Sequence, residues 1–136
     1  EHRYGYRRGE DGGSFEEALA AVRKWGGVLE HPAWSAAWAH FGLTPPLGAW
    51  WTRSVTDEGW TCEVSQSAYG HPARKRTWLY YVGPDPQPLR TNVGEITATV
   101  SWASYGWRPT RRRLRSLEAS RTPPDFRDAL IELVAA

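Results

Sequence analysis

Residues 74–83 read Arg-Lys-Arg-Thr-Trp-Leu-Tyr-Tyr-Val-Gly, in which three cations precede six apolar, aromatic or β-branched residues. Because such side chains fit a pleated, half-buried surface, residues 77–82 predict a buried strand. Trp60–Ser65 alternates in a way that predicts a second strand, and residues 67–73 predict a loop between the two. We therefore expect a sheet at the centre of the chain, with the three cations at the root of one strand.

The sequence before this sheet predicts two helices and a short strand. Ser14, followed three residues later by a glutamate, has the spacing of a capping box and begins the first helix, which ends at Gly26-Gly27. Residues 28–30 predict a short apolar strand. Residues 35–41 predict a second helix, with Ser35 as its cap. The apolar residues of the first helix recur at helical spacing: Phe15, Leu19 and Val22.

The sequence after the sheet predicts one more strand and two helices. Residues 96–102 alternate as a strand, residues 110–119 predict an arginine-dense helix, and Thr122-Pro123-Pro124-Asp125 opens a last helix with a threonine cap. Helices and strands mixed in this order predict a single α/β domain over residues 14–136. Residues 1–13 are polar and rich in glycine and arginine, and they predict a flexible lead-in.

The composition excludes several classes of protein. A chain of 136 residues, 40% hydrophobic and 24% charged, has enough apolar sequence for a folded core, and no apolar run approaches the length of a membrane span. The net charge of +2 does not by itself imply nucleic-acid binding. A single cysteine, Cys62, excludes an internal disulfide and a Cys-rich zinc site, so we expect a reducing, cytoplasmic location and no metal. Nine tryptophans exceed what an interior needs. Most are expected to fill the core and a flat face of the molecule, and one or two to stack on a ligand.

Two segments bear residues that could form a site. Glu30 ends the strand at residues 28–30, and open α/β sheets bind ligands at the carboxyl ends of their strands. Arg74 and Arg76 stand at the root of the strand at residues 77–82, and the planar fork of arginine suits a phosphate or a base carbonyl. The structural alternatives are that Glu30 forms a salt bridge or caps the next turn, and that the cations belong to a solvated turn.

Three segments in order resemble the carboxyl half of the cytosine-5 DNA methyltransferases of bacteria and phages. Tyr69-Gly70-x-Pro72-x-Arg74-x-Arg76, with Val82-Gly83 after it, resembles their Gln-x-Arg-x-Arg region. Val28-Leu29-Glu30-His31-Pro32 resembles their Glu-Asn-Val motif, and Thr122-Pro123-Pro124-Asp125-Phe126 resembles the start of their closing helix. The resemblance covers residues 28–136 and implies a partial Rossmann-like sheet with flanking helices.

The resemblance also implies roles for individual residues. Glu30 would hydrogen-bond the flipped cytosine and activate its ring, and Arg74 and Arg76 would contact the base carbonyl and the neighbouring phosphates. Thr122 and Pro123 would lie near the S-adenosylmethionine cofactor. The implied partner is DNA, together with a separate or missing N-terminal half that binds the cofactor.

The sequence departs from this family at the positions that carry its chemistry. His31 replaces the usual asparagine, and the turn before Arg74 lacks the glutamine. The chain has neither a Phe-x-Gly-x-Gly cofactor loop nor a Pro-Cys nucleophile, because Cys62 lies between Thr61 and Glu63 on a predicted strand. As it stands, the chain cannot carry out cysteine-dependent methyl transfer.

A third cluster of candidate residues combines arginines with aromatic side chains. Cations around aromatic rings can follow a phosphate backbone while a ring stacks on a base. The alternative is a solvent-facing helix side with Leu114 and Leu117 packed inward. The arginines are Arg108, Arg111, Arg112, Arg113 and Arg115, and the aromatic residues are Trp102, Tyr105 and Trp107.

Taken together, these observations favour the DNA-binding, target-base-recognising part of a phage-type DNA-modifying enzyme that resembles a methyltransferase. One alternative is a non-catalytic nucleic-acid-binding or inhibitory phage protein on the same scaffold. The other is a small protein-interaction domain whose tryptophans mark the partner surface.

Overall fold

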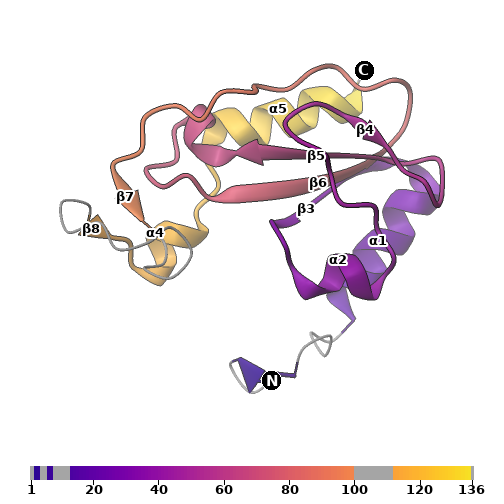
Figure 1. Cartoon of the computed structure of the whole chain (residues 1–136), viewed down its shortest axis with the longest axis horizontal. Coiled ribbons are helices and arrows are strands. Elements are labelled where there is room, and N and C mark those ends of the chain that lie inside the picture. The colour runs from indigo at the N-terminus through magenta and orange to yellow at the C-terminus, as the bar shows by residue number, and fades with distance from the viewer. Residues whose placement is uncertain (1, 4–5, 8–12, 100–111, 136) are drawn as a thin grey trace.

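The centre of the protein is a four-stranded sheet. The computed structural model describes residues 2–3, 6–7, 13–99 and 112–135 (Figure 1). Its main sheet has the strand order β3-β6-β5-β4, and every neighbouring pair is antiparallel. The predicted central strands are confirmed, and the short strand predicted at residues 28–30 is longer than expected. The strands are β3 (Gly27–Pro32), β4 (Thr52–Arg53), β5 (Trp60–Ser65) and β6 (Arg76–Val82).

The mixed helix and strand composition agrees with the expected α/β class, whereas the expected Rossmann-like sheet is not confirmed. A Rossmann-like sheet is mostly parallel, because a helical crossover follows each strand and returns the chain in the same direction. Here β5 is followed by the short helix η1 (Gln66–Tyr69) and a turn, and the chain then comes back antiparallel as β6. A connection this short requires antiparallel pairing.

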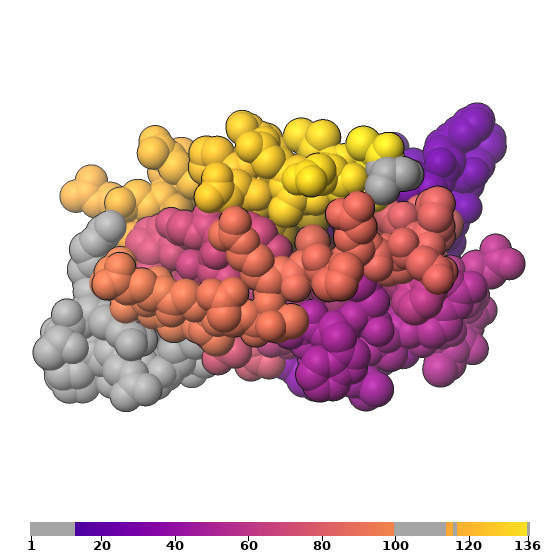
Figure 2. Space-filling view, turned by 90° about the horizontal axis from the view of Figure 1, so that it is seen from above, coloured from indigo at the N-terminus to yellow at the C-terminus, as the bar shows by residue number. Residues whose placement is uncertain are grey.

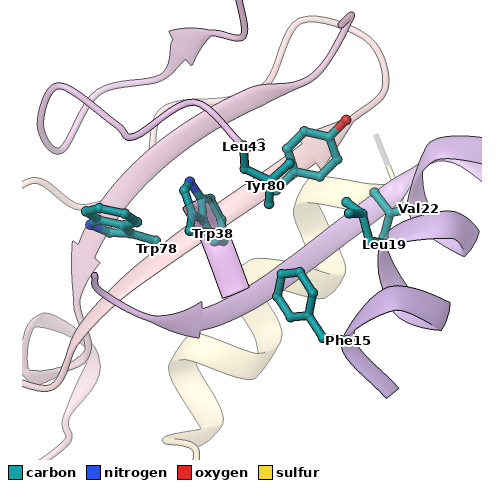
Figure 3. Packing of buried hydrophobic residues seen from close by; sticks show 7 residues of the cluster. All are labelled: Phe15, Leu19, Val22, Trp38, Leu43, Trp78 and Tyr80. Carbon is teal, nitrogen blue, oxygen red and sulfur yellow. The ribbon is translucent and has the colours of Figure 1, made fainter. Parts of the chain in front are cut away.

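Helices cover both faces of the sheet (Figure 1). One face, the α1 face, packs against α1 (Ser14–Trp25) and α2 (Ala36–His40), and the other, the α5 face, packs against α5 (Pro124–Ala135). Figure 3 shows the core of the α1 face, which consists of Phe15, Leu19, Val22, Trp38, Leu43, Trp78 and Tyr80. The core of the α5 face consists of Cys62, Val64, Ala68, Tyr69, Leu79 and Phe126.

The ends of the first two helices follow local backbone chemistry. The cap of α1 is Gly13, in the left-handed region with φ 79°, and it forms no side-chain cap hydrogen bond. The expected Ser14 cap is therefore wrong, because Ser14 is already the first helical residue. Gly26, with φ 80°, ends α1 as predicted, and its N–H donates to the carbonyl of Val22. The Ser35 hydroxyl accepts from the Ala37 amide at 3.2 Å, which confirms the predicted cap of α2.

A smaller unit packs beside the main sheet. Its strands β7 (Ala98–Thr99) and β8 (Arg112–Arg113) pair in parallel, and α4 (Ser116–Ser120) follows. The helix expected at residues 110–119 is therefore wrong at Arg112 and Arg113, which form a strand. The strand expected at residues 96–102 is found at β7 within the part of the chain that the structure describes.

At the start of the chain, β1 (His2–Arg3) pairs with β2 (Tyr6–Arg7), and most of the expected lead-in at residues 1–13 lies outside the described residues. None of the helices in the described part of the chain combines the length and the apolar character that crossing a bilayer requires.

Candidate functional site

The three cations at the start of β6 have three different surroundings. The Nε and Nη2 atoms of Arg76 donate to both carboxylate oxygens of Glu63, at 2.9 and 3.0 Å. The Nε atom of Arg74 donates to the hydroxyl of Ser65 at 3.1 Å. Lys75, between them, is close enough to Glu30 for the two charges to interact. Lys75 therefore has a different charged neighbour from Arg76, which binds Glu63.

Glu63 organises the arginine side of this segment. Besides Arg76, its carboxylate accepts a hydrogen bond from the indole N–H of Trp78 at 2.9 Å, and Trp78 is only 2% exposed. Burial alone would raise the pKa of Glu63, but the hydrogen bonds from Arg76 and Trp78 outweigh it and lower that pKa. Glu63 is thus held ionised, and it fixes the Arg76 guanidinium in a bidentate geometry.

Trp34 lies directly beside these groups. Its ring centroid is 4.7 Å from that of Trp78, yet the residue is 70% exposed. The turn that contains Trp34 is joined to β6 by a hydrogen bond of 3.0 Å from the Ala33 amide to the Arg76 carbonyl. We call Trp34, Arg74 and Arg76 the Trp–Arg surface.

The backbone of this region is unusual. Within the described residues, Trp34 and Lys75 are the non-glycine residues with positive φ, at 63° and 44°. Each such conformation costs about 1–3 kcal/mol and persists where the surrounding structure enforces it, often at functional sites. Both residues belong to turns at the same end of the sheet, one after β3 and one before β6.

Glu30 does not join the Trp–Arg surface. It pairs with Leu79 across the sheet, and Leu79 belongs to the core of the α5 face. Arg76 lies three residues before Leu79 and so points to the opposite face. Glu30 therefore does not lie beside Arg76, although the roles that the resemblance implies require Glu30, Arg74 and Arg76 to meet at one base. Glu30 is exposed as a residue, but burial of its carboxyl group raises its pKa, and the charge of Lys75 opposes that rise.

The structure describes only some of the candidate arginines and aromatic residues between residues 102 and 115. Trp107, Arg108 and Arg111 lie outside the described residues, as do Trp102 and Tyr105. Arg112 and Arg113 form β8, and Arg115 is exposed just before α4.

The small unit that carries β8 packs close to the cations of β6. The amides of Thr97 and Ala98 donate to the Pro72 carbonyl, at 2.8 and 3.0 Å, and Ala73 shares a buried cluster with Ala98 and Leu114. The imidazole of His71 approaches the Ala119 carbonyl at 3.2 Å. Two cation-bearing segments, residues 74–76 and 112–115, are thus brought to one end of the sheet.

Thr122 and Pro123, expected near a cofactor, lie just before the start of α5. Pro123 is buried, and its carbonyl accepts from the amides of Phe126 and Arg127, so it serves to start α5. Thr122 is exposed. Neither residue lines the groove beside α5, and their place near S-adenosylmethionine stays a prediction.

A groove of about 390 Å³ lies elsewhere, between α5 and the segment that follows β6. Figure 2 shows α5 running alongside that segment. Among the described residues, no salt bridge involves Asp125 or Glu132, two of the three carboxylates in this groove. The three carboxylates outnumber Arg90, the cation of this lining, and a net negative lining disfavours phosphate. The groove is lined by Tyr69, Gln87, Pro88, Leu89, Arg90, Asp125, Asp128, Ala129, Glu132 and Leu133.

Cys62 and the other possible metal ligands form no reactive centre. Cys62 is fully buried, and burial raises the pKa of its thiol to about 12. In the described part of the chain, no group of three or more His, Cys, Asp or Glu residues could hold a metal ion.

Sequence reasoning missed Glu63 and Trp34 as site residues. Glu63 lies between buried Cys62 and buried Val64 on β5, and a charge in a buried strand is a signal that it has a partner. Trp34 precedes the Ser35 cap in a turn, where a large aromatic residue has no core to fill.

Comparisons with protein-family models, with curated proteins and with solved structures found no match to this chain.

Proposed function

We propose that this chain is a DNA-binding domain that holds the phosphate backbone at the end of the sheet where residues 74–76 and 112–115 converge. The observation that carries the proposal is this convergence of two cation-bearing segments that are distant in the sequence. Each phosphate contact with lysine or arginine releases counterions, which is the main source of affinity for DNA.

The charges that remain after internal pairing support this role. Glu63 neutralises Arg76, and Glu30 lies near Lys75. Among the described residues, no salt bridge involves Arg74 or Arg115. Arg74 is held by Ser65, and a guanidinium held in this way loses less conformational entropy when it binds phosphate.

The proposal keeps the partner that the methyltransferase resemblance implies, but not the chemistry. Base activation would require Glu30 beside Arg74 and Arg76, whereas Glu30 belongs to the other face of the sheet. A non-catalytic nucleic-acid-binding protein is the class that fits this geometry best.

The test measures binding of fluorescein-labelled oligodeoxythymidylate, and of a labelled mixed-sequence duplex, by fluorescence anisotropy at increasing salt concentration. The slope of the logarithm of the binding constant against the logarithm of the salt concentration should become shallower in Arg74→Ala and in Arg115→Ala. We expect a change of about 0.7 on the single strand, or about 0.9 on the duplex, for each phosphate contact removed. Arg127→Ala is the matched control, because Arg127 is exposed on α5 and pairs only with its neighbour Asp128 among the described residues. Absence of binding at low salt, or slopes that both variants leave unchanged, would overturn the proposal.

A further inference from the structure

We infer that the Trp–Arg surface selects single-stranded over duplex DNA, because Trp34 stacks on an unpaired base while Arg74 meets a flanking phosphate. This inference rests on the proposed function and adds to it the class of nucleic acid and the residue that reads it. It is carried by the geometry of Trp34 and not by the net charge of the region.

The aromatic ring of Trp34 is exposed and is nevertheless held in place. Trp34 is 70% exposed, and burying such a ring on a partner is favourable. One side of it contacts Trp78, which packs in turn against Trp38 at a centroid distance of 5.5 Å. Trp38 is 1% exposed and donates its indole N–H to the Thr44 carbonyl at 3.0 Å. The exposed ring is thus supported from below by two buried indoles.

The ring of Trp34 is also connected to Arg76 through shared partners. Trp78, under Trp34, and Arg76 both bind the carboxylate of Glu63. The Ala33 amide, next to Trp34, binds the Arg76 carbonyl. One carboxylate and one backbone hydrogen bond therefore set the position of the ring relative to the guanidinium groups. A preorganised ring beside cations is the arrangement with which proteins bind single strands: bases stack on aromatic side chains and cations follow the backbone.

The backbone at Trp34 is strained. Trp34 occupies the left-handed region, where a bulky residue is a true outlier and glycine would be favoured. A core role does not explain this cost, since most of the residue lies in solvent. A duplex keeps its bases stacked inside, so an exposed ring of this kind can engage a base only where the strand is unpaired.

The experiment compares oligodeoxythymidylate with a duplex of the same length, for the wild type and for variants at two exposed tryptophans. Trp34→Ala should weaken binding of the single strand about five- to a hundredfold and leave binding of the duplex nearly unchanged. Trp34→Phe should lose less affinity than Trp34→Ala, because it retains a smaller ring. The matched control is Trp25→Ala, since Trp25 is 78% exposed at the end of α1 and contacts Lys24.

A further variant separates stacking from folding. Trp34→Gly removes the ring and also suits the left-handed backbone, so this variant should fold while losing the preference for single strands. Equal affinity of the wild type for both forms of DNA, or unchanged single-strand affinity in folded Trp34→Gly, would overturn this inference. In that case the salt dependence through Arg74 would still support DNA binding, whereas a complete lack of binding would overturn both proposals.

Discussion

Trp78 and Tyr80 occupy neighbouring positions on the α1 face of β6, and each donates a hydrogen bond to a carboxylate that also binds an arginine. The first cluster, the Trp78 cluster, consists of Trp78, Glu63 and Arg76. The second, the Tyr80 cluster, consists of Tyr80, Asp57 and Arg23, with Tyr80–Asp57 at 2.9 Å and Arg23–Asp57 at 3.2 Å.

The two clusters contain the same kinds of hydrogen bond and ion pair but connect different parts of the molecule. The Tyr80 cluster joins α1, through Arg23, to the loop before β5, through Asp57. Gly59 allows this close fit, because a Cβ atom at this position would collide with the Tyr80 ring. The Trp78 cluster lies on the central strands β5 and β6 alone, and exposed Trp34 rests on it. The Tyr80 cluster holds α1 and the loop before β5 together, whereas the Trp78 cluster supports an exposed surface.

The largest effect is expected from Glu63→Ala. This change leaves the buried indole N–H of Trp78 without its acceptor and frees Arg76, so the free energy of unfolding should fall by about 2–3 kcal/mol. Affinity for oligodeoxythymidylate should fall as well, because Trp34 and Arg76 lose their support. Chemical denaturation and anisotropy measure the two effects. A variant as stable as the wild type would show that Glu63 does not organise this region.

A smaller effect, on stability alone, is expected from Asp57→Asn. The substitution removes the charge that pairs with Arg23 and weakens the acceptor for Tyr80, so unfolding should become easier by about 1–2 kcal/mol. DNA affinity should stay at the wild-type level, measured in the same anisotropy assay. If Asp57→Asn weakened DNA binding as much as Glu63→Ala, the division between the two clusters would be wrong.

Acid should destabilise both clusters together. For Asp57, burial favours the neutral form, but hydrogen bonds from Gly59 and Tyr80 lower its pKa, and the pKa of Glu63 is also lowered. A carboxyl group whose pKa is lower in the folded state stabilises the fold above its unfolded pKa, and that contribution is lost as the pH falls. Stability should therefore decline from about pH 4.5 downward, where unfolded carboxyl groups begin to bind protons.

In the Asp57→Asn and Glu63→Gln variants, stability should decline less with acid than in the wild type. Thermal unfolding, measured across this pH range, tests this. An unchanged acid profile in both variants would contradict these pKa directions.

The smallest effect is expected from Glu30→Gln, on the other face of the sheet. Burial raises the pKa of Glu30, so its ionised form costs stability at neutral pH, and this cost disappears as the pH falls through the folded pKa. The neutral variant should be more stable by at most about 0.5 kcal/mol at pH 7, with DNA affinity unchanged. A clear loss of single-strand affinity would instead support a base-reading role for Glu30.

Much of the fold could be predicted from residue patterns. The strands at Trp60–Ser65 and residues 77–82 follow from runs of β-branched and aromatic residues. Helix α1 follows from helical periodicity, and α5 follows from the prolines and the aspartate at its start. The pairing direction could not be read in this way, because it depends on how the chain returns after each strand.

Less of the site could be predicted, for a related reason. Arg74 and Arg76 are visible as a cluster of cations, but their partner Glu63 lies on another strand, and only the register brings it opposite Trp78. Once β3 and β6 are paired, alternation places Glu30 and Arg76 on opposite faces, and no local pattern reveals this. The turn that contains Trp34 is placed by the hydrogen bond from the Ala33 amide to β6, which is again a tertiary contact.

The most direct test of the central claim is a titration of ¹⁵N-labelled protein with oligodeoxythymidylate, followed through the indole N–H resonances of the tryptophans. Loss of one resonance in Trp34→Phe assigns the signal of Trp34. The account predicts that the signals of Trp34 and Trp78 shift with the added strand, while that of Trp25 and the backbone amides of Arg23 and Asp57 stay in place. Shifts centred on the α5 groove or on the Tyr80 cluster, with the Trp34 signal unmoved at saturation, would contradict it.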